Sequence, residues 1–137
     1  MRVLGIMLLA MLSLPAACTP DQTGQTVTIG RVSPWPLARA AAPKDPPRIL
    51  AAEMSSDSVR QGEWWSGRVA TTTNVAVVEL RSPSFSFILE RPSYGQFRFR
   101  THVLVVPSIY RRGFDAALIA RNAAGQEDRR VAHLSFR

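Results

Sequence analysis

Three kinds of residue in this chain are able to do chemistry: a single cysteine, two histidines and a large set of arginines. Cys18 is the only cysteine among 137 residues, so it forms neither an internal disulfide nor a cysteine-rich metal site. It remains available as a nucleophile, as an intermolecular bridge or as a point of lipid attachment. The segment around it indicates which of these roles applies.

The histidines give little support to catalysis or metal binding. His102 and His133 both fall in expected strands, and neither belongs to an H-E-x-x-H or other recognised metal-ligand spacing. The chain also has no G-x-S-x-G serine motif and no glycine-rich phosphate loop. We therefore predict that the protein is not an enzyme and that it uses no metal and no cofactor. The alternative is an unrecognised site built from His102, His133 and a carboxylate.

Arginine supplies sixteen of the 17 basic residues, against 10 acidic ones, for a formal net charge of +7. This excess favours an anionic partner or is simply a solvated surface. Within YGQFRFRTH, Arg98 and Arg100 share one face of an expected strand, and Arg111 and Arg112 follow in the next connection. Guanidinium groups suit carboxylates and phosphates, so these four residues are a possible anion- or partner-binding set. The alternative is that Arg98 and Arg100 only protect an edge strand.

The N-terminus has the layout of a secretory signal peptide over residues 1–17. A short basic start precedes an apolar run, Val3 to Leu14. That run is shorter than the roughly 20 residues that a membrane-spanning helix needs. We therefore expect export rather than retention as a membrane span.

The end of this signal resembles the cleavage box of bacterial lipoproteins. Ala16, Ala17 and Cys18 match the last positions of the box, and Pro15 stands where that family prefers leucine. In that family the chain is cleaved before the cysteine, whose thiol then carries diacylglycerol. The resemblance implies a lipid anchor on Cys18. Ordinary cleavage near Ala17, which leaves a soluble exported protein, is the alternative.

Residues 18–47 are rich in proline and alanine and have too little apolar bulk to form a core. We expect them to form a partly extended linker between the anchor and a folded domain. Within the linker, TVTIGRV (residues 26–32) alternates well enough for a short strand. Trp35 lies between two prolines and either docks a partner or folds back onto the domain.

Residues 48–137 alternate apolar and polar side chains in short runs separated by turn residues. This pattern shows no sustained helical period, so it predicts an all-β antiparallel sandwich of about seven strands. The expected strands cover residues 49–54, 65–71, 75–81, 85–89, 97–100 with an extension into HVLVV, 114–120 and 132–136.

The C-terminal part, FDAALIARNAAG followed by RRVAHLSF, resembles the last hairpin of bacterial immunoglobulin-like domains. In those domains an Ala-x-Asn-x-x-Gly turn joins the final two strands, and Ala120, Asn122 and Gly125 fit it. QGEWWSGRVATTTNVAVVEL resembles their second and third strands. The resemblance covers residues 48–137 and implies a single immunoglobulin-like β-sandwich, here without a cysteine pair between its sheets.

These observations predict an exported, lipid-anchored, non-enzymatic interaction or structural module of the bacterial cell envelope, on the periplasmic or cell-surface side. Its partners would be the membrane, through Cys18, and an unidentified envelope protein or acidic glycan. An alternative is an anion-binding envelope protein that uses the arginine-rich strand face for an acidic glycan or a lipid headgroup. Nucleic acid is not an expected partner, because the chain has no recognition module for it.

Overall fold

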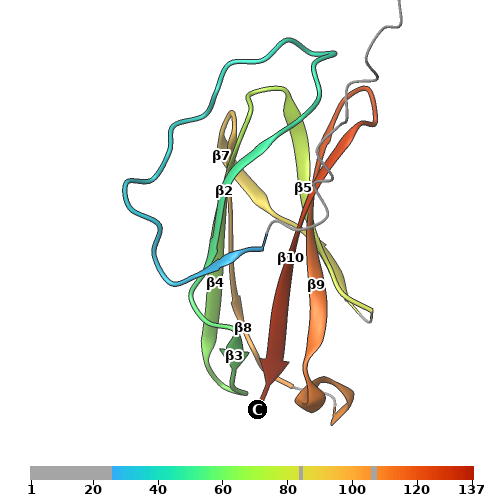
Figure 1. Cartoon of the computed structure of the whole chain (residues 1–137). Helices are drawn as coiled ribbons and strands as arrows, with labels where there is room; N and C mark the ends of the chain where they lie inside the picture. Colours follow the sequence, from blue (N-terminus) through green and yellow to red (C-terminus); the bar gives the residue numbers. More distant parts are fainter. Residues whose placement is uncertain (1–25, 84, 106–107) are drawn as a thin grey trace, which may run out of the picture.

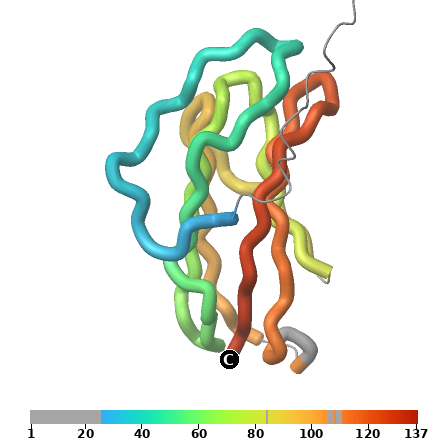
Figure 2. Tube along the Cα trace, viewed as in Figure 1, coloured from blue at the N-terminus to red at the C-terminus, as the bar shows by residue number. Residues whose placement is uncertain are grey.

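Two β-sheets packed face to face form the described part of the chain (Figures 1 and 2). The structure is a computed structural model that describes residues 26–83, 85–105 and 108–137. One sheet has the strand order β1-β2-β4-β8-β7 and the other β3-β10-β9-β5-β6. The prediction of an all-β fold is confirmed, and the fold consists of two sheets.

The first sheet contains β1 (Thr28–Ile29), β2 (Ile49–Met54), β4 (Trp64–Thr71), β7 (Glu90–Ser93) and β8 (Gln96–His102). The second contains β3 (Ser58–Val59), β5 (Val75–Arg81), β6 (Ser86–Ile88), β9 (Phe114–Asn122) and β10 (Glu127–Phe136). A short 3-10 helix, η1 (Ser108–Arg112), lies between β8 and β9.

All seven expected strands are present, but β10 begins at Glu127, five residues before the expected start at residue 132. β8 ends at His102 and does not continue through HVLVV. Two short strands were not expected, β3 and β7, while β1 lies inside the predicted strand of residues 26–32. The pairing is not purely antiparallel, because β1 runs parallel to β2 and β3 runs parallel to β10.

The core lies between the sheets and is centred on aromatic residues. Trp65 is 2% exposed, and its ring centroid lies 4.8 Å from that of Phe99 and 5.9 Å from that of Phe136. The indole Nε1–H of Trp65 donates to the Ser56 carbonyl at 3.2 Å, so this buried polar group is satisfied. The sequence has no cysteine pair that could join the two sheets. Aromatic packing therefore holds them together in the interior.

Hydrogen bonds also join the sheets at the start of β2. The Ile49 N–H donates to Asp128 Oδ2 at 2.6 Å, and Arg130 Nη2 donates to the Ile49 carbonyl at 2.9 Å. Asp128 and Arg130 belong to β10, in the other sheet. These charge-assisted contacts fix the position of β2 against β10.

The predicted linker is not free of the domain over its described part, residues 26–47. Val27 is buried, and Trp35 folds back so that its Nε1–H donates to Gln96 Oε1 at 2.9 Å. The Ala41 N–H donates to Thr73 Oγ1 at 3.1 Å, and Asn122 Nδ2 donates to the Asp45 carbonyl at 3.0 Å. The segment therefore lies along the sandwich, as the blue-to-teal tube in Figure 2 shows. The proline-rich composition of the segment did not indicate this arrangement. Most of the contacts are single hydrogen bonds, and these leave no recognisable pattern in the sequence.

The chain changes sheet at Leu89. β6 pairs with β5 in the second sheet, the Leu89 N–H donates to the Val78 carbonyl at 2.9 Å, and β7 then pairs with β8 in the first sheet. The β7–β8 pairing extends no further along β8 than Arg98. In the described part of the chain, residues 99–102 of β8 therefore have β4 on one side and no strand on the other.

Candidate binding surface

The outer face of the first sheet carries a row of charged side chains that crosses four strands. The strand register places Glu53 beside Arg68, Arg68 beside Arg98, and Arg98 beside Glu90. Arg68 pairs with Glu53, and Arg98 holds both carboxylate oxygens of Glu90 at 3.1 and 3.2 Å. The Arg98 guanidinium lowers the pKa of Glu90 by hydrogen bonding and charge attraction, so this exposed pair is ionised at neutral pH.

Two aromatic rings adjoin this row. The Arg68 guanidinium lies over the Trp35 ring at 4.0 Å from its centroid, and the Arg100 guanidinium lies over Trp64 at 4.4 Å. Trp64 also contacts His102, with ring centroids 5.0 Å apart, yet it remains 59% exposed. Stacking of this kind orients a guanidinium while leaving its N–H groups able to donate.

A groove of about 450 Å³ runs along the same face. We call it the arginine groove; it is lined by Gly30, Arg31, Glu53, Met54, Ser55, Ser66, Gly67, Arg68, Arg98, Phe99 and Arg100. Four of these side chains are cationic and only Glu53 is anionic. Arg31 and Arg100 have no ion-pair partner among the described residues, and two serine side chains lie beside them. The groove can therefore bind carboxylate or phosphate groups.

Gly67 lies on the inward face of β4, where it leaves room for Phe99 of the neighbouring strand β8. A Cβ atom at this position would lie 2.5 Å from Phe99 Cε1 and 2.7 Å from the Glu53 carbonyl oxygen. Neither distance is tolerable, and the second neighbour is backbone that cannot move aside easily. Glycine therefore allows the Phe99 ring to pack directly against β4, below the charged row.

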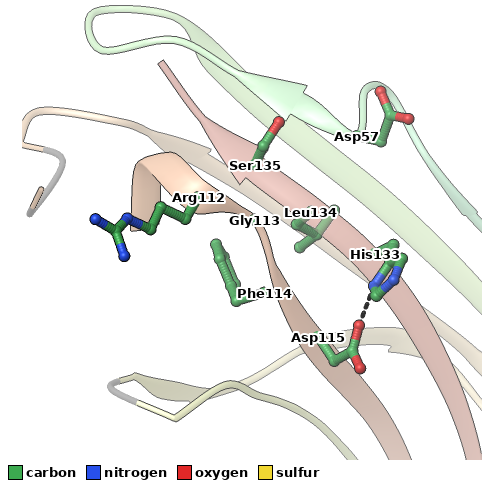
Figure 3. A pocket seen from close by; sticks show the side chains of 8 residues that line it. All are labelled: Asp57, Arg112, Gly113, Phe114, Asp115, His133, Leu134 and Ser135. Atoms are coloured by element: carbon green, nitrogen blue, oxygen red, sulfur yellow. Dashed lines mark ion pairs between the residues drawn. The ribbon is translucent and has the colours of Figure 1, made fainter. Parts of the chain in front are cut away.

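The four arginines of the predicted set do not form one site. Arg98 and Arg100 line the arginine groove, whereas Arg111 and Arg112 are exposed on η1, which packs against β10 of the second sheet. Arg112 lines a different pocket, of about 500 Å³, together with Asp115 and His133 (Figure 3). The predicted set is thus split between two separate surfaces.

The two histidines are also separated. His133 lies opposite Asp115 in the β9–β10 ladder, and its Nδ1 contacts Asp115 Oδ1. His102 lies on β8 of the first sheet, where its Nε2 is 2.7 Å from the Gly62 carbonyl oxygen. Both histidines alternate with inward-facing residues and are exposed, so they project from opposite faces of the sandwich. The alternative prediction of a site built from His102, His133 and a carboxylate is therefore wrong.

The His133–Asp115 contact lies on the surface and is not the centre of an enclosed site. The two side chains are 89% and 60% exposed. In Figure 3 the side chains of Arg112 and Asp57 extend away from the pair. Among residues 26–83, 85–105 and 108–137, no group of three or more His, Cys, Asp or Glu side chains is arranged to hold a metal ion.

The anchor residue Cys18 lies outside the described residues. In the described part of the chain, no helix is long and apolar enough to cross a membrane.

Comparisons with known proteins do not place the chain in a family. No model of a known protein family matches it, and no curated protein matches it. Among solved structures, it is similar to a superoxide reductase (neelaredoxin) from Ignicoccus hospitalis. The identity is 12% and the TM-score 0.43, over 67% of this chain and 80% of that one. A likeness this distant carries no argument about function.

Several residues of the arginine groove were not predicted from the sequence. Arg31 lies in the predicted linker, and Arg68 and Ser66 lie on the outward face of a predicted strand, where no motif marks them. Arg68 becomes the neighbour of Arg98 only through the β4–β8 register. The alternation in WWSGRVAT placed Arg68 on the outer face, but no feature of the sequence indicates which strand lies beside it.

Proposed function

We propose that this protein is an exported, lipid-anchored, non-enzymatic interaction module of the bacterial cell envelope that binds an anionic partner through the arginine groove. The observation that carries the proposal is the groove itself, in which four arginines face a single glutamate. Two of the arginines, Arg31 and Arg100, have no ion-pair partner among the described residues. A cationic groove of this kind attracts negatively charged groups and orients them through the guanidinium N–H donors.

An immunoglobulin-like sandwich is part of the proposal. The order β2-β4-β8-β7 corresponds to the ABED sheet of such domains, and β10-β9-β5 corresponds to the GFC sheet. The last hairpin also supports it, because Gly125 has a positive φ of 83° and the Gln126 N–H donates to Asn122 Oδ1 at 2.9 Å. Domains of this class commonly serve as binding modules, since their sheet faces and edges are open to partners.

The test measures binding of the full chain to two polyanions, poly-glutamate and polygalacturonate, over a series of salt concentrations. We expect binding that weakens steeply as salt rises. The double variant Arg98→Ala/Arg100→Ala should weaken it about thirtyfold, because it removes two charge-assisted interactions that are each worth on the order of 1 kcal/mol.

The matched control is Arg111→Ala/Arg112→Ala, which removes the same charge from outside the groove. This variant should bind almost as well as the wild type. Equal losses in the two variants would mean that only net charge attracts the polyanions. Either that result or a failure of the wild type to bind both polymers at low salt would overturn the proposed function.

A further inference from the structure

The free part of β8 presents backbone groups that are ready to pair. The Val103 N–H donates to the Glu63 carbonyl at 3.0 Å, and the Thr71 N–H donates to the Gly95 carbonyl at 2.8 Å. Odd-numbered residues along this stretch therefore bond toward β4, and successive residues of an antiparallel strand bond to opposite sides. The N–H and C=O groups of Arg100 and His102 consequently point to the side where, in the described part of the chain, no strand lies.

A hollow of about 410 Å³ adjoins this free edge. Its lining joins the two sheets, with Phe87 and Ile88 from β6 and Arg98 to Thr101 from β8. Phe87 meets Phe99 edge to face, with centroids 5.5 Å apart, and Ile88 is 61% exposed. The hollow exists because the chain leaves the second sheet at Leu89 and reaches β8 only at Arg98.

We propose that the edge at Arg100 and His102 accepts an extended peptide segment as an additional strand, and that this peptide alternates acidic and apolar residues. The inference rests on the proposed function and specifies its partner as a protein segment. Every second side chain of an added strand faces the same way. One set of side chains lies over Phe87 and Phe99 in the hollow, where apolar groups are favoured. The other set lies on the outer face beside Arg98 and Arg100, where carboxylates are favoured.

A second copy of this chain is a poor occupant of the same edge. Antiparallel pairing of two β8 edges would bring arginines from one copy close to those of the other, and like charges opposite each other are destabilising. The net charge of +7 acts in the same direction. The charges that repel a second copy are the ones that attract an acidic peptide.

The experiment compares two short peptides of equal composition. One alternates glutamate and valine, and the other carries the glutamates and valines in separate blocks. We expect the full chain to bind the alternating peptide at least about tenfold more tightly, because only this peptide satisfies both faces of the added strand. N-methylation of alternate residues of the peptide, on the side that would pair with β8, should abolish that preference. It removes the peptide's N–H donors and leaves its side chains in place.

Amide exchange measured by NMR provides the readout that a purely electrostatic contact would not change. On binding the alternating peptide, the amides of Arg100 and His102 should become protected. Thr101 is the internal control, because its amide already bonds toward β4 and should change little. Equal binding of both peptides without protection at Arg100 and His102 would overturn strand addition. If both peptides bound equally and the variant Arg98→Ala/Arg100→Ala bound neither, the proposed function would stand without strand addition.

Discussion

Glu79 lies buried on the outer face of the second sheet and is held by three partners. It accepts hydrogen bonds from Ser86 Oγ, from Arg121 Nη1 at 2.7 Å and from Arg81 Nη2 at 3.0 Å. The Ser86 hydrogen bond, followed by those of Arg121 and Arg81, lowers the pKa of Glu79 from 4.5 to about 2. Burial opposes this change but is the smaller effect. The carboxylate is therefore ionised over the whole physiological pH range.

Replacing Glu79 should make the free energy of unfolding vary less with pH in the acid range. Because the folded pKa is about 2 and the ordinary value is 4.5, the carboxylate stabilises the fold above pH 4.5, and this contribution is lost as the pH falls towards 2. Glu79→Gln should lower the free energy of unfolding by about 2–3 kcal/mol at neutral pH. Urea denaturation of the wild type and of Glu79→Gln at pH 7 and at pH 3 measures this effect. The difference between their free energies of unfolding should be smaller at pH 3.

The control for this prediction is Glu90→Gln, at an exposed carboxylate with one arginine partner. Exposed ion pairs contribute little to stability, so its effect should be clearly smaller. An equal difference in the free energy of unfolding between wild type and Glu79→Gln at pH 7 and at pH 3 would contradict the assignment of the stabilisation to the ionised carboxylate.

At the residue scale, the sequence indicated side-chain direction but not neighbours. Arg98 and Arg100 share the outer face of β8, as expected, and Phe97 and Phe99 alternate with them in the core, since direction follows from the two-residue period of a strand. The ion pairs of Arg68 and Arg98 depend on pairing between strands distant in the sequence. That register is fixed by the whole sheet, so the groove could not be assembled from sequence alone.

At the element scale, the most informative segment is the docked part of the linker. The Trp35 ring lies under the Arg68 guanidinium, and its N–H bonds to Gln96. Further along, the Thr73 N–H donates to the Arg39 carbonyl at 2.8 Å. The backbone at Arg39 is thus held against the sandwich, although the Arg39 residue itself is exposed.

Trp35→Ala should release this segment without unfolding the sandwich. The variant loses a hydrogen bond and a cation–π contact, together worth about 1–2 kcal/mol. Local opening should therefore become about tenfold more frequent, and tryptic cleavage after Arg39 should accelerate to a similar degree. Mass spectrometry of timed digests measures this rate.

Cleavage after Arg60 provides the internal control for the proteolysis. Arg60 is exposed between β3 and β4, so its cleavage rate should not depend on Trp35. An unchanged ratio of cleavage after Arg39 to cleavage after Arg60 would show that Trp35 does not hold the segment in place.

The period-two pattern predicted the main strands because each one buries a full face. β3 has only two residues, and the four residues of β7 are all exposed, so neither carries a readable alternation. β7 exists because a turn at Gly95, whose φ is +72°, folds it back onto β8. The glycine in RPSYG favours the turn, but no feature of the sequence indicates the strand that precedes it.

At the scale of the whole molecule, the proposed anchor determines where the arginine groove works. We expect the wild-type protein, expressed in a bacterium, to incorporate a fatty-acid analogue and to sediment with membranes. Cys18→Ala should lose both the label and membrane sedimentation, because the thiol is the only attachment point of its kind in the chain. In-gel detection of the label and fractionation measure the two outcomes.

The signal-peptide region supplies a second arm to this test. Ser13→Ala alters the same segment and leaves the thiol intact, so its label should match that of the wild type. A label that survives Cys18→Ala, or the absence of a label from the wild type, would favour a soluble exported protein instead.

The first described residues join the two sheets, and this arrangement has a mechanical consequence. The Val27 N–H bonds to the Val131 carbonyl in β10 at 3.1 Å, and the Gly30 N–H bonds to the Met54 carbonyl in β2 at 2.8 Å. A pull on the chain before Thr26 therefore loads these bonds before it loads the sandwich. Once they and the other contacts of the segment give way, residues 26–47 can extend to at most about 80 Å. A module held at its N-terminus would then have two working heights, with its binding face close to the anchor when the segment is docked and far from it under tension.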